Sequence, residues 1–155
     1  MKVSLKYYTI KYLITILLLL IIAVWAVLFY AYILDEVYDN VDDGLKNRKI
    51  QIIKAAYVDE NLLHNNEFGF NEFKINPISA SEYKDKNSLY NKMYYMEYDD
   101  EEQPYRVLTT DFTDQFGKHQ QLTVRTSTVE EDELVYDLTT ALIVLYLLLV
   151  VSIVA

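Results

Sequence analysis

The stretch YLITILLLLIIAVWAVLFYAYIL, residues 12–34, contains no charged residue, and a second uncharged stretch, LTTALIVLYLLLVVSIVA, occupies residues 138–155. A bilayer core about 30 Å thick is crossed by roughly 20 apolar residues in a helix, so both stretches are long enough to span it. The sequence therefore predicts an N-terminal flank (1–11), two transmembrane helices (12–34 and 138–155) and a central domain (35–137). Because the last residue falls inside the second stretch, we expect a protein truncated at this point.

Charge predicts the orientation. The N-terminal flank carries Lys2, Lys6 and Lys11 and no acidic residue, which favours a cytoplasmic N-terminus. All 23 acidic residues lie between Asp35 and Asp137 beside 11 basic ones, giving the central domain a net charge of −12. A cleaved signal peptide is disfavoured, because the apolar run exceeds the usual apolar region of roughly 7–15 residues and no A-x-A site follows. We expect a two-pass protein of the bacterial inner membrane with a periplasmic central domain.

Composition excludes several kinds of chemistry. There are no cysteines, so disulfides and thiol chemistry are excluded, and their absence from so small an outer domain favours a bacterial envelope protein. Three scattered glycines cannot build a phosphate-binding loop, and His64 and His119 are too isolated to suggest a metal site. The negative charge disfavours nucleic acid as a partner. We expect a non-enzymatic chain without a cofactor, with the lipid bilayer as a partner.

A long helix is predicted to run out of the first apolar stretch to about Tyr57. Apolar residues recur at helical spacing, among them Val41, Leu45 and Ile52, and no proline interrupts the segment. These residues have two interpretations, which sequence alone leaves open. They pack on the sheet of their own domain, or one seam also pairs with a second copy as the stalk of a homodimer. In the second case, single cysteines at these positions should crosslink with helical periodicity.

Strand-type patterns follow the helix, which makes the fold class α+β. A short strand is expected to end near Pro77, and the segments 91–98, 104–115 and 119–128 predict a three-stranded antiparallel meander, with a turn at 99–104. Residues 128–131, TVEE, fit a capping box at the start of a helix that continues into the second apolar stretch. The predicted domain thus has a membrane-continuous helix at each end and a sheet between them.

An acidic cluster marks the tip of the predicted hairpin. It consists of Glu97, Asp99, Asp100, Glu101 and Glu102. Carboxylate oxygens are the natural ligands of Ca²⁺ and Mg²⁺, so the cluster is a candidate cation site. The alternative, which we favour, is a solvated charged turn that protects a sheet edge from aggregation.

The segments DEVYDNVDDGLKNRK (35–49), SLYNKMYYMEYDDEEQPYRVLTTDF (88–112) and QLTVRTSTVEEDELVYDL (121–138) resemble the input region of bacterial two-component sensor histidine kinases. The resemblance is to membrane kinases of Bacteroidetes-type bacteria and covers essentially the whole chain. It implies a small PAS-like sensor domain, an unknown extracytoplasmic ligand, a homodimer, signal transduction across the membrane and phosphorelay to a cognate response regulator.

The parent protein would be a kinase whose catalytic core uses ATP and Mg²⁺. This chain carries no acceptor-histidine or ATP-binding motif, and His64 and His119 lie on the outer side in no such context. We therefore expect no phosphorylation by the chain itself. The competing interpretation is a stand-alone two-span envelope protein with a structural or partner-binding role.

Overall fold

The computed structural model describes residues 2–155, with side chains from Ser4 onward. Contacts divide the chain into two units. The helical unit comprises the described residues up to Glu36 together with Asp132–Ala155, and the sheet unit comprises Val37–Glu131. The elements, in chain order, are α1 (Lys2–Val58), the short 3₁₀ helix η1 (Glu60–His64), β1 (Phe73–Pro77), β2 (Ser88–Met96), β3 (Glu101–Thr113), β4 (His119–Ser127) and α2 (Val129–Val154).

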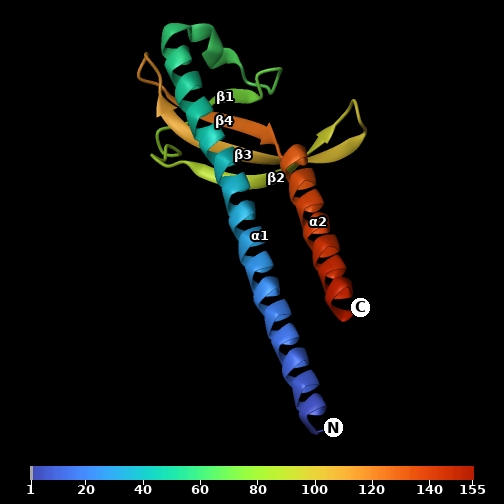
Figure 1. Cartoon of the computed structure of the whole chain (residues 1–155). Coiled ribbons are helices and arrows are strands. Elements are labelled where there is room, and N and C mark those ends of the chain that lie inside the picture. Colours follow the sequence, from blue (N-terminus) through green and yellow to red (C-terminus); the bar gives the residue numbers. More distant parts are fainter. Residues whose placement is uncertain (1) are drawn as a thin grey trace. The chain divides into compact units, whose positions relative to one another are not determined.

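The sheet unit contains a four-stranded antiparallel sheet with the strand order β1-β4-β3-β2 (Figure 1). The meander β2-β3-β4 confirms the three strands predicted from the alternating pattern. The short strand expected near Pro77 is β1, which pairs with β4 and becomes the fourth strand of the same sheet. The α+β fold class is therefore confirmed, with a sheet one strand wider than the predicted meander.

The second half of α1 covers one face of this sheet (Figure 1). Leu45 and Ala56 from the helix join Leu108 of β3 and Leu122 and Val124 of β4 in a single hydrophobic core. Successive strand residues point to opposite faces, so Leu108 and its register partner Val124 both face the helix. The predicted helix end near Tyr57 is confirmed, since α1 ends at Val58.

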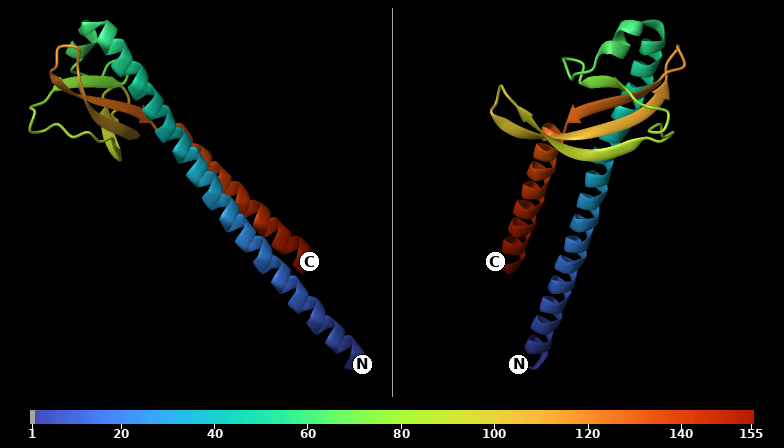
Figure 2. Two further views of the ribbon diagram at one scale, coloured as in Figure 1. Left: turned by 90° about the vertical axis from the view of Figure 1, so that its left-hand side faces the viewer. Right: turned by 180° about the vertical axis from the view of Figure 1, so that it is seen from behind.

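In the helical unit, α1 and α2 run side by side in opposite directions, as both views in Figure 2 show. The Tyr146 hydroxyl of α2 donates a hydrogen bond to the Leu19 carbonyl oxygen of α1 at 3.4 Å. Small side chains, including Ala23, Ala26 and Thr139, line an apolar cavity of about 280 Å³ between the two helices. Both α1 and α2 are long and apolar enough to cross a membrane by length and composition.

The hairpin tip differs from the prediction, which placed a turn at 99–104. β3 already begins at Glu101, opposite Met96, so the turn is confined to residues 97–100. Pro104, predicted as the last residue of the turn and the first of the strand, pairs with Met93 three residues inside β3. Its carbonyl oxygen accepts a hydrogen bond from the Thr128 N–H at 3.1 Å, one residue past the end of β4. Because the N and C=O of one residue point to the same side of a strand, the missing N–H of Pro104 faces the side where β4 has ended and removes no bond to β2.

The start of α2 is where the sequence predicts it, but the cap takes another form. The buried Thr128 hydroxyl donates to the Pro104 carbonyl at 3.4 Å, which holds it against β3. The side chain that meets the first turn is Ser127, whose hydroxyl accepts from the Val129 N–H at 3.4 Å. Contact with the neighbouring strand has thus displaced the local cap that the TVEE pattern suggested.

Candidate functional site

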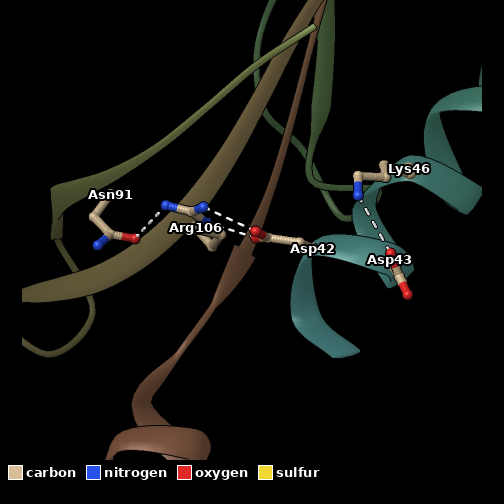
Figure 3. Close-up of polar contacts among 5 residues, drawn as sticks. All are labelled: Asp42, Asp43, Lys46, Asn91 and Arg106. Atoms are coloured by element: carbon tan, nitrogen blue, oxygen red, sulfur yellow. Dashed lines mark hydrogen bonds and ion pairs between the residues drawn. The ribbon is translucent and has the colours of Figure 1, made fainter. Parts of the chain in front are cut away.

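An ion pair joins α1 to the sheet within the sheet unit (Figure 3). Arg106 of β3 donates from Nε to Asp42 Oδ1 at 2.6 Å and from Nη2 to Asp42 Oδ2 at 2.9 Å. Its remaining nitrogen, Nη1, donates to Asn91 Oδ1 of β2 at 3.1 Å. We call these three residues the Asp42–Arg106 clamp. Two parallel bonds fix both the distance and the orientation of the two groups, which a single contact would not do.

The clamp follows from the periodicity of its elements. Arg106 lies two residues before Leu108, so the strand turns both side chains toward α1. Asp42 lies three residues before the buried Leu45 and therefore on the same helical face. Asn91 is the direct register partner of Arg106. The polar clamp thus continues the face that forms the core, at the end nearest the apolar part of α1.

Partial burial strengthens the clamp. The Arg106 and Asp42 side chains are 22% and 19% exposed. The hydrogen bonds from Arg106 hold the pKa of Asp42 below its usual value, against the opposing effect of burial. A second pair beside it, Lys46 and Asp43, lies in solvent with side chains 48% and 70% exposed (Figure 3). The two pairs therefore provide a partly buried case and an exposed case on the same helix.

A cation also lies among aromatic rings on the other face of the sheet. The Arg125 guanidinium of β4 lies 3.9 Å from the ring centre of Phe68, 4.5 Å from that of Tyr94 and 4.7 Å from that of Tyr105. Its Nε donates to Glu72 at 2.5 Å. Burial raises the pKa of both tyrosines. The arrangement holds the loop between η1 and β1 against the sheet, which is a structural role.

The stalk residues named from the sequence lie partly inside the sheet unit. Leu45 is 1% exposed in the core, and Ile52 packs against the same core. Val41 is half-buried. Packing on their own domain therefore accounts for Leu45 and Ile52. Pairing of α1 with a second copy stays a prediction, and it would have to use exposed positions such as Ile50.

The acidic hairpin tip does not gather its carboxylates around one point. Asp100 accepts a hydrogen bond from the Tyr95 hydroxyl, and Asp99 accepts one from Gln103 Nε2 at 2.8 Å. Among residues 2–155 no group of three or more His, Asp or Glu side chains is placed to hold a metal ion. Cation binding by Glu97, Asp99, Asp100, Glu101 and Glu102 remains a prediction.

The helix–sheet–helix arrangement and the clamp lie within a region that matches a known family model. The model, described as a domain of unknown function (DUF8486), covers residues 6–151. The chain belongs to this family. No curated protein and no solved structure matches the chain. The DUF8486 match includes the first apolar stretch, the whole sheet unit and residues 138–151 of the second apolar stretch.

Sequence reasoning missed the clamp, because its contacts depend on tertiary structure. Asp42 was one acid among several in a charged helix, and Arg106 was one residue of a strand. The signal that could have found the clamp is the placement of Asp42 on the apolar face that contains Leu45, since a charged residue there needs a partner. Its partner, 64 residues later, could not be identified from spacing.

Proposed function

We propose that this chain is the sensing and transmembrane input region of a two-component sensor histidine kinase. In this proposal the sheet unit is a PAS-like periplasmic domain, and the apolar parts of α1 and α2 cross the inner membrane. The chain itself contributes no catalysis. Kinase activity, ATP and Mg²⁺, and transfer to a response regulator belong to a core outside this sequence.

The observation that carries the proposal is the direct connection of the sheet to both apolar helices. α1 is continuous from Lys2 to Val58, and the clamp ties it to β3 just beyond its apolar part. At the other end, β4 ends at Ser127 and α2 begins at Val129. A rearrangement of the sheet therefore has a short covalent route into α2 and an ion-paired route into α1. Such coupling requires that a ligand favour one of two states of the sheet unit.

The surface of the helical unit supports placement in a bilayer. Large apolar side chains cover it on all sides; exposed examples are Leu13, Leu17, Trp25, Leu145 and Leu148. Contiguous apolar surface of this kind is unfavourable in water and favourable in lipid, at about 25 cal/mol per Å². The lysine-rich flank and the acidic sheet unit support a cytoplasmic N-terminus and a periplasmic domain.

A second candidate function is a stand-alone two-span envelope protein that binds a partner. The edge strand β2 favours it, because β2 pairs only with β3 within the described sheet and exposes Met93 and Tyr95. Unpaired strand edges bind extended segments of other chains. A partner-binding protein needs no coupling between the sheet and the two helices, which separates it from the sensor.

A chimeric kinase tests the proposal. Residues 1–155 would replace the input region of a membrane histidine kinase, with junctions lengthened residue by residue over one helical turn, about 3.6 residues. If α2 transmits a signal, autophosphorylation should rise and fall with the helical phase of the junction. The kinase core without an input region serves as the control. Equal phosphorylation at every junction, indistinguishable from that control, would contradict the proposal.

Membrane topology is tested separately by cysteine labelling. The chain has no cysteine, so a single introduced thiol reports one position. A membrane-impermeant maleimide added to intact spheroplasts should modify Lys86→Cys in the sheet unit. Lys6→Cys should react only after the membrane is permeabilised. The reverse pattern would contradict the proposed orientation, and equal labelling of both positions would contradict membrane crossing.

A further inference from the structure

One edge of the sheet is closed and the other is open. At β1, the Ile75 N–H donates to the Asn65 carbonyl at 2.7 Å, and Asn65 Nδ2 donates to the Phe73 carbonyl at 3.0 Å. The strand then ends at Pro77, which has no N–H to offer. At the other edge, no segment of the described chain pairs with β2 besides β3. The described sheet can therefore gain a further strand at β2 and not at β1.

Pro104 shows which backbone groups of β2 face the open edge. Its carbonyl oxygen points to Thr128, away from β2, so its register partner Met93 also has its N–H and C=O pointing away from β3. The register between β2 and β3 runs from Ser88 to Met96 without a bulge, so every second residue is oriented in the same way. The residues whose N–H and C=O face the open edge are Leu89, Asn91, Met93 and Tyr95, and no described turn, loop or cap bonds to these groups.

The strand β2 has little of the protection that natural edge strands carry. Such strands are normally shielded from pairing by charges, proline, bulges or a covering segment. β2 is 9 residues long, contains no proline, and has Lys92 as its one charged residue. Beside the open edge, Met93 and Tyr95 are 51% and 57% exposed on the face that α1 shares. This edge fits an extended polypeptide, whose backbone bonds to β2 and whose alternate side chains lie on Met93 and Tyr95.

The turn that follows β2 indicates the charge of that polypeptide. Glu97, Glu101 and Glu102 are exposed, and no ion pair reaches them among the residues that the structure describes. Asp99 and Asp100 add two more negative charges to the same turn. Because β2 runs into this turn, an antiparallel fifth strand would bring its N-terminal residues beside it. Lys or Arg side chains at that end would meet uncompensated carboxylates, whereas acidic ones would be repelled.

We propose that the β2 edge binds an extended segment of another protein as an antiparallel fifth strand. Lys or Arg near the N-terminal end of that segment lies against the acidic turn, and apolar side chains at alternate positions lie on Met93 and Tyr95. All neighbouring strands in the sheet are antiparallel, and antiparallel pairing is the more stable kind.

A second copy of the chain is the main competing occupant, and the direction of α1 disfavours it. A two-fold axis between two antiparallel β2 strands stands perpendicular to the sheet. Because α1 lies along one face of the sheet (Figure 1), this axis would point the two α1 helices in opposite directions. In the proposed topology, their apolar parts could then not enter one bilayer from the same side.

The inference goes beyond the proposed function, because it names a class of partner, and the binding does not depend on coupling between the sheet and the helices. The test therefore uses the full chain in detergent micelles, without a kinase. If the chimeric kinase failed, binding at β2 would still stand. If binding failed, the chimera would still test the sensor.

The experiment selects a displayed library of random peptides, each as long as the 9 residues of β2, on the full chain. Dissociation constants of the selected peptides are then measured. We expect Lys and Arg to be enriched in the N-terminal third of these peptides. N-methylation of single peptide bonds should weaken binding about 10-fold or more at every second residue and leave it unchanged in between, because only alternate N–H groups point at β2. This measurement uses the unaltered chain, so it does not depend on the folding of a variant.

Variants locate the site on the sheet. Met93→Pro removes one N–H from the open edge and no bond to β3, so it should weaken binding about 10-fold, whereas Met93→Val should leave affinity unchanged. The double variant Glu101→Gln with Glu102→Gln should weaken binding of the basic peptides about 3-fold at low salt. Its matched control, Glu60→Gln with Glu67→Gln, changes two exposed glutamates outside the hairpin and should leave affinity unchanged.

Four results would each overturn the proposal: selected peptides that are not basic, an N-methylation scan without alternation, equal binding by Met93→Pro and Met93→Val, or equal binding by the two double glutamate variants. It is also overturned if light scattering shows a dimer of the unaltered chain that Met93→Pro converts to a monomer, since a second copy would then occupy the edge.

Discussion

Removing the Asp42–Arg106 clamp should release α1 from β3 at a measurable cost in stability. The perturbation is a double-mutant cycle of Asp42→Ala, Arg106→Ala and the double variant. Arg106→Ala should be the more damaging single change. It leaves the Asp42 carboxylate partly buried without its cation, and it also removes the bond to Asn91.

The magnitude follows from exposure and geometry. Hydrogen bonds to charged groups contribute about 1.5–3 kcal/mol, whereas exposed ion pairs contribute about 0.2–1 kcal/mol. The clamp has two short bonds between side chains 22% and 19% exposed, which places it between an exposed pair and a fully buried one. We therefore predict a coupling energy of about 2 kcal/mol for the cycle.

The matched control is the neighbouring pair on the same helix. Lys46 and Asp43 are 3.3 Å apart but largely exposed, so a cycle of Lys46→Ala and Asp43→Ala should give about 0.3 kcal/mol. Both cycles would be measured on the full chain in detergent micelles by urea unfolding, followed by the near-ultraviolet circular dichroism of tyrosine. Trp25 is the sole tryptophan and lies outside the sheet unit, so its fluorescence is not a suitable probe.

A coupling energy for Asp42 and Arg106 no larger than that of the exposed pair would refute the reasoning. It would mean that the clamp does not hold α1 on the sheet. The ion-paired route from the sheet into α1 would then be lost, and only the covalent connections to the helices would remain.

Three further outcomes are expected. The pKa values of Asp42 and Asp114 are lowered from 3.8, so their contribution to stability is full above that pH and is lost as the pH falls through the lower folded-state values. Asp42→Asn should flatten this acid dependence of stability in urea titrations at several pH values. An unchanged pH profile would contradict the assignment. Arg125→Lys should lower the free energy of unfolding by about 1–2 kcal/mol in the same urea assay, because lysine cannot stack on three rings as a guanidinium does. An unchanged unfolding midpoint would exclude the aromatic contacts as a source of stability. Leu45→Cys, 1% exposed, should resist aqueous maleimide while Ile50→Cys, 45% exposed, reacts; equal rates would remove Leu45 from the core.

The order of the helices and strands along the chain could be predicted from the sequence, because each element has a clear local pattern of apolar residues. The uncharged stretches, the helix to Val58 and the alternation of Leu122, Val124 and Thr126 all follow from residues close together in sequence. The pairing of Glu101 with Met96 at the hairpin end of β2 and β3 could not be predicted in this way. Proline and four acids in six residues indicate a turn, and only pairing across the hairpin extends β3 through Pro104.

The ion pairs and buried polar groups depend on contacts between segments far apart in sequence, and most of these contacts could not be predicted from the sequence. Leu45 was rightly placed on an apolar helical seam, but spacing alone did not tell whether that seam meets the sheet or a second copy. Arg125 and its rings come from a loop and three strands, and no local pattern links them. Gln120 resembled any polar strand residue until its burial beside Asp114 was known.

The most direct test of the central claim is the nucleotide sequence of the source gene beyond the codon for Ala155. The account predicts an open frame that continues into basic residues, a linker helix, a helix with an acceptor histidine and an ATP-binding domain. A stop codon at that point, with no such coding sequence behind it, would contradict the sensor-kinase assignment and favour the stand-alone partner-binding protein.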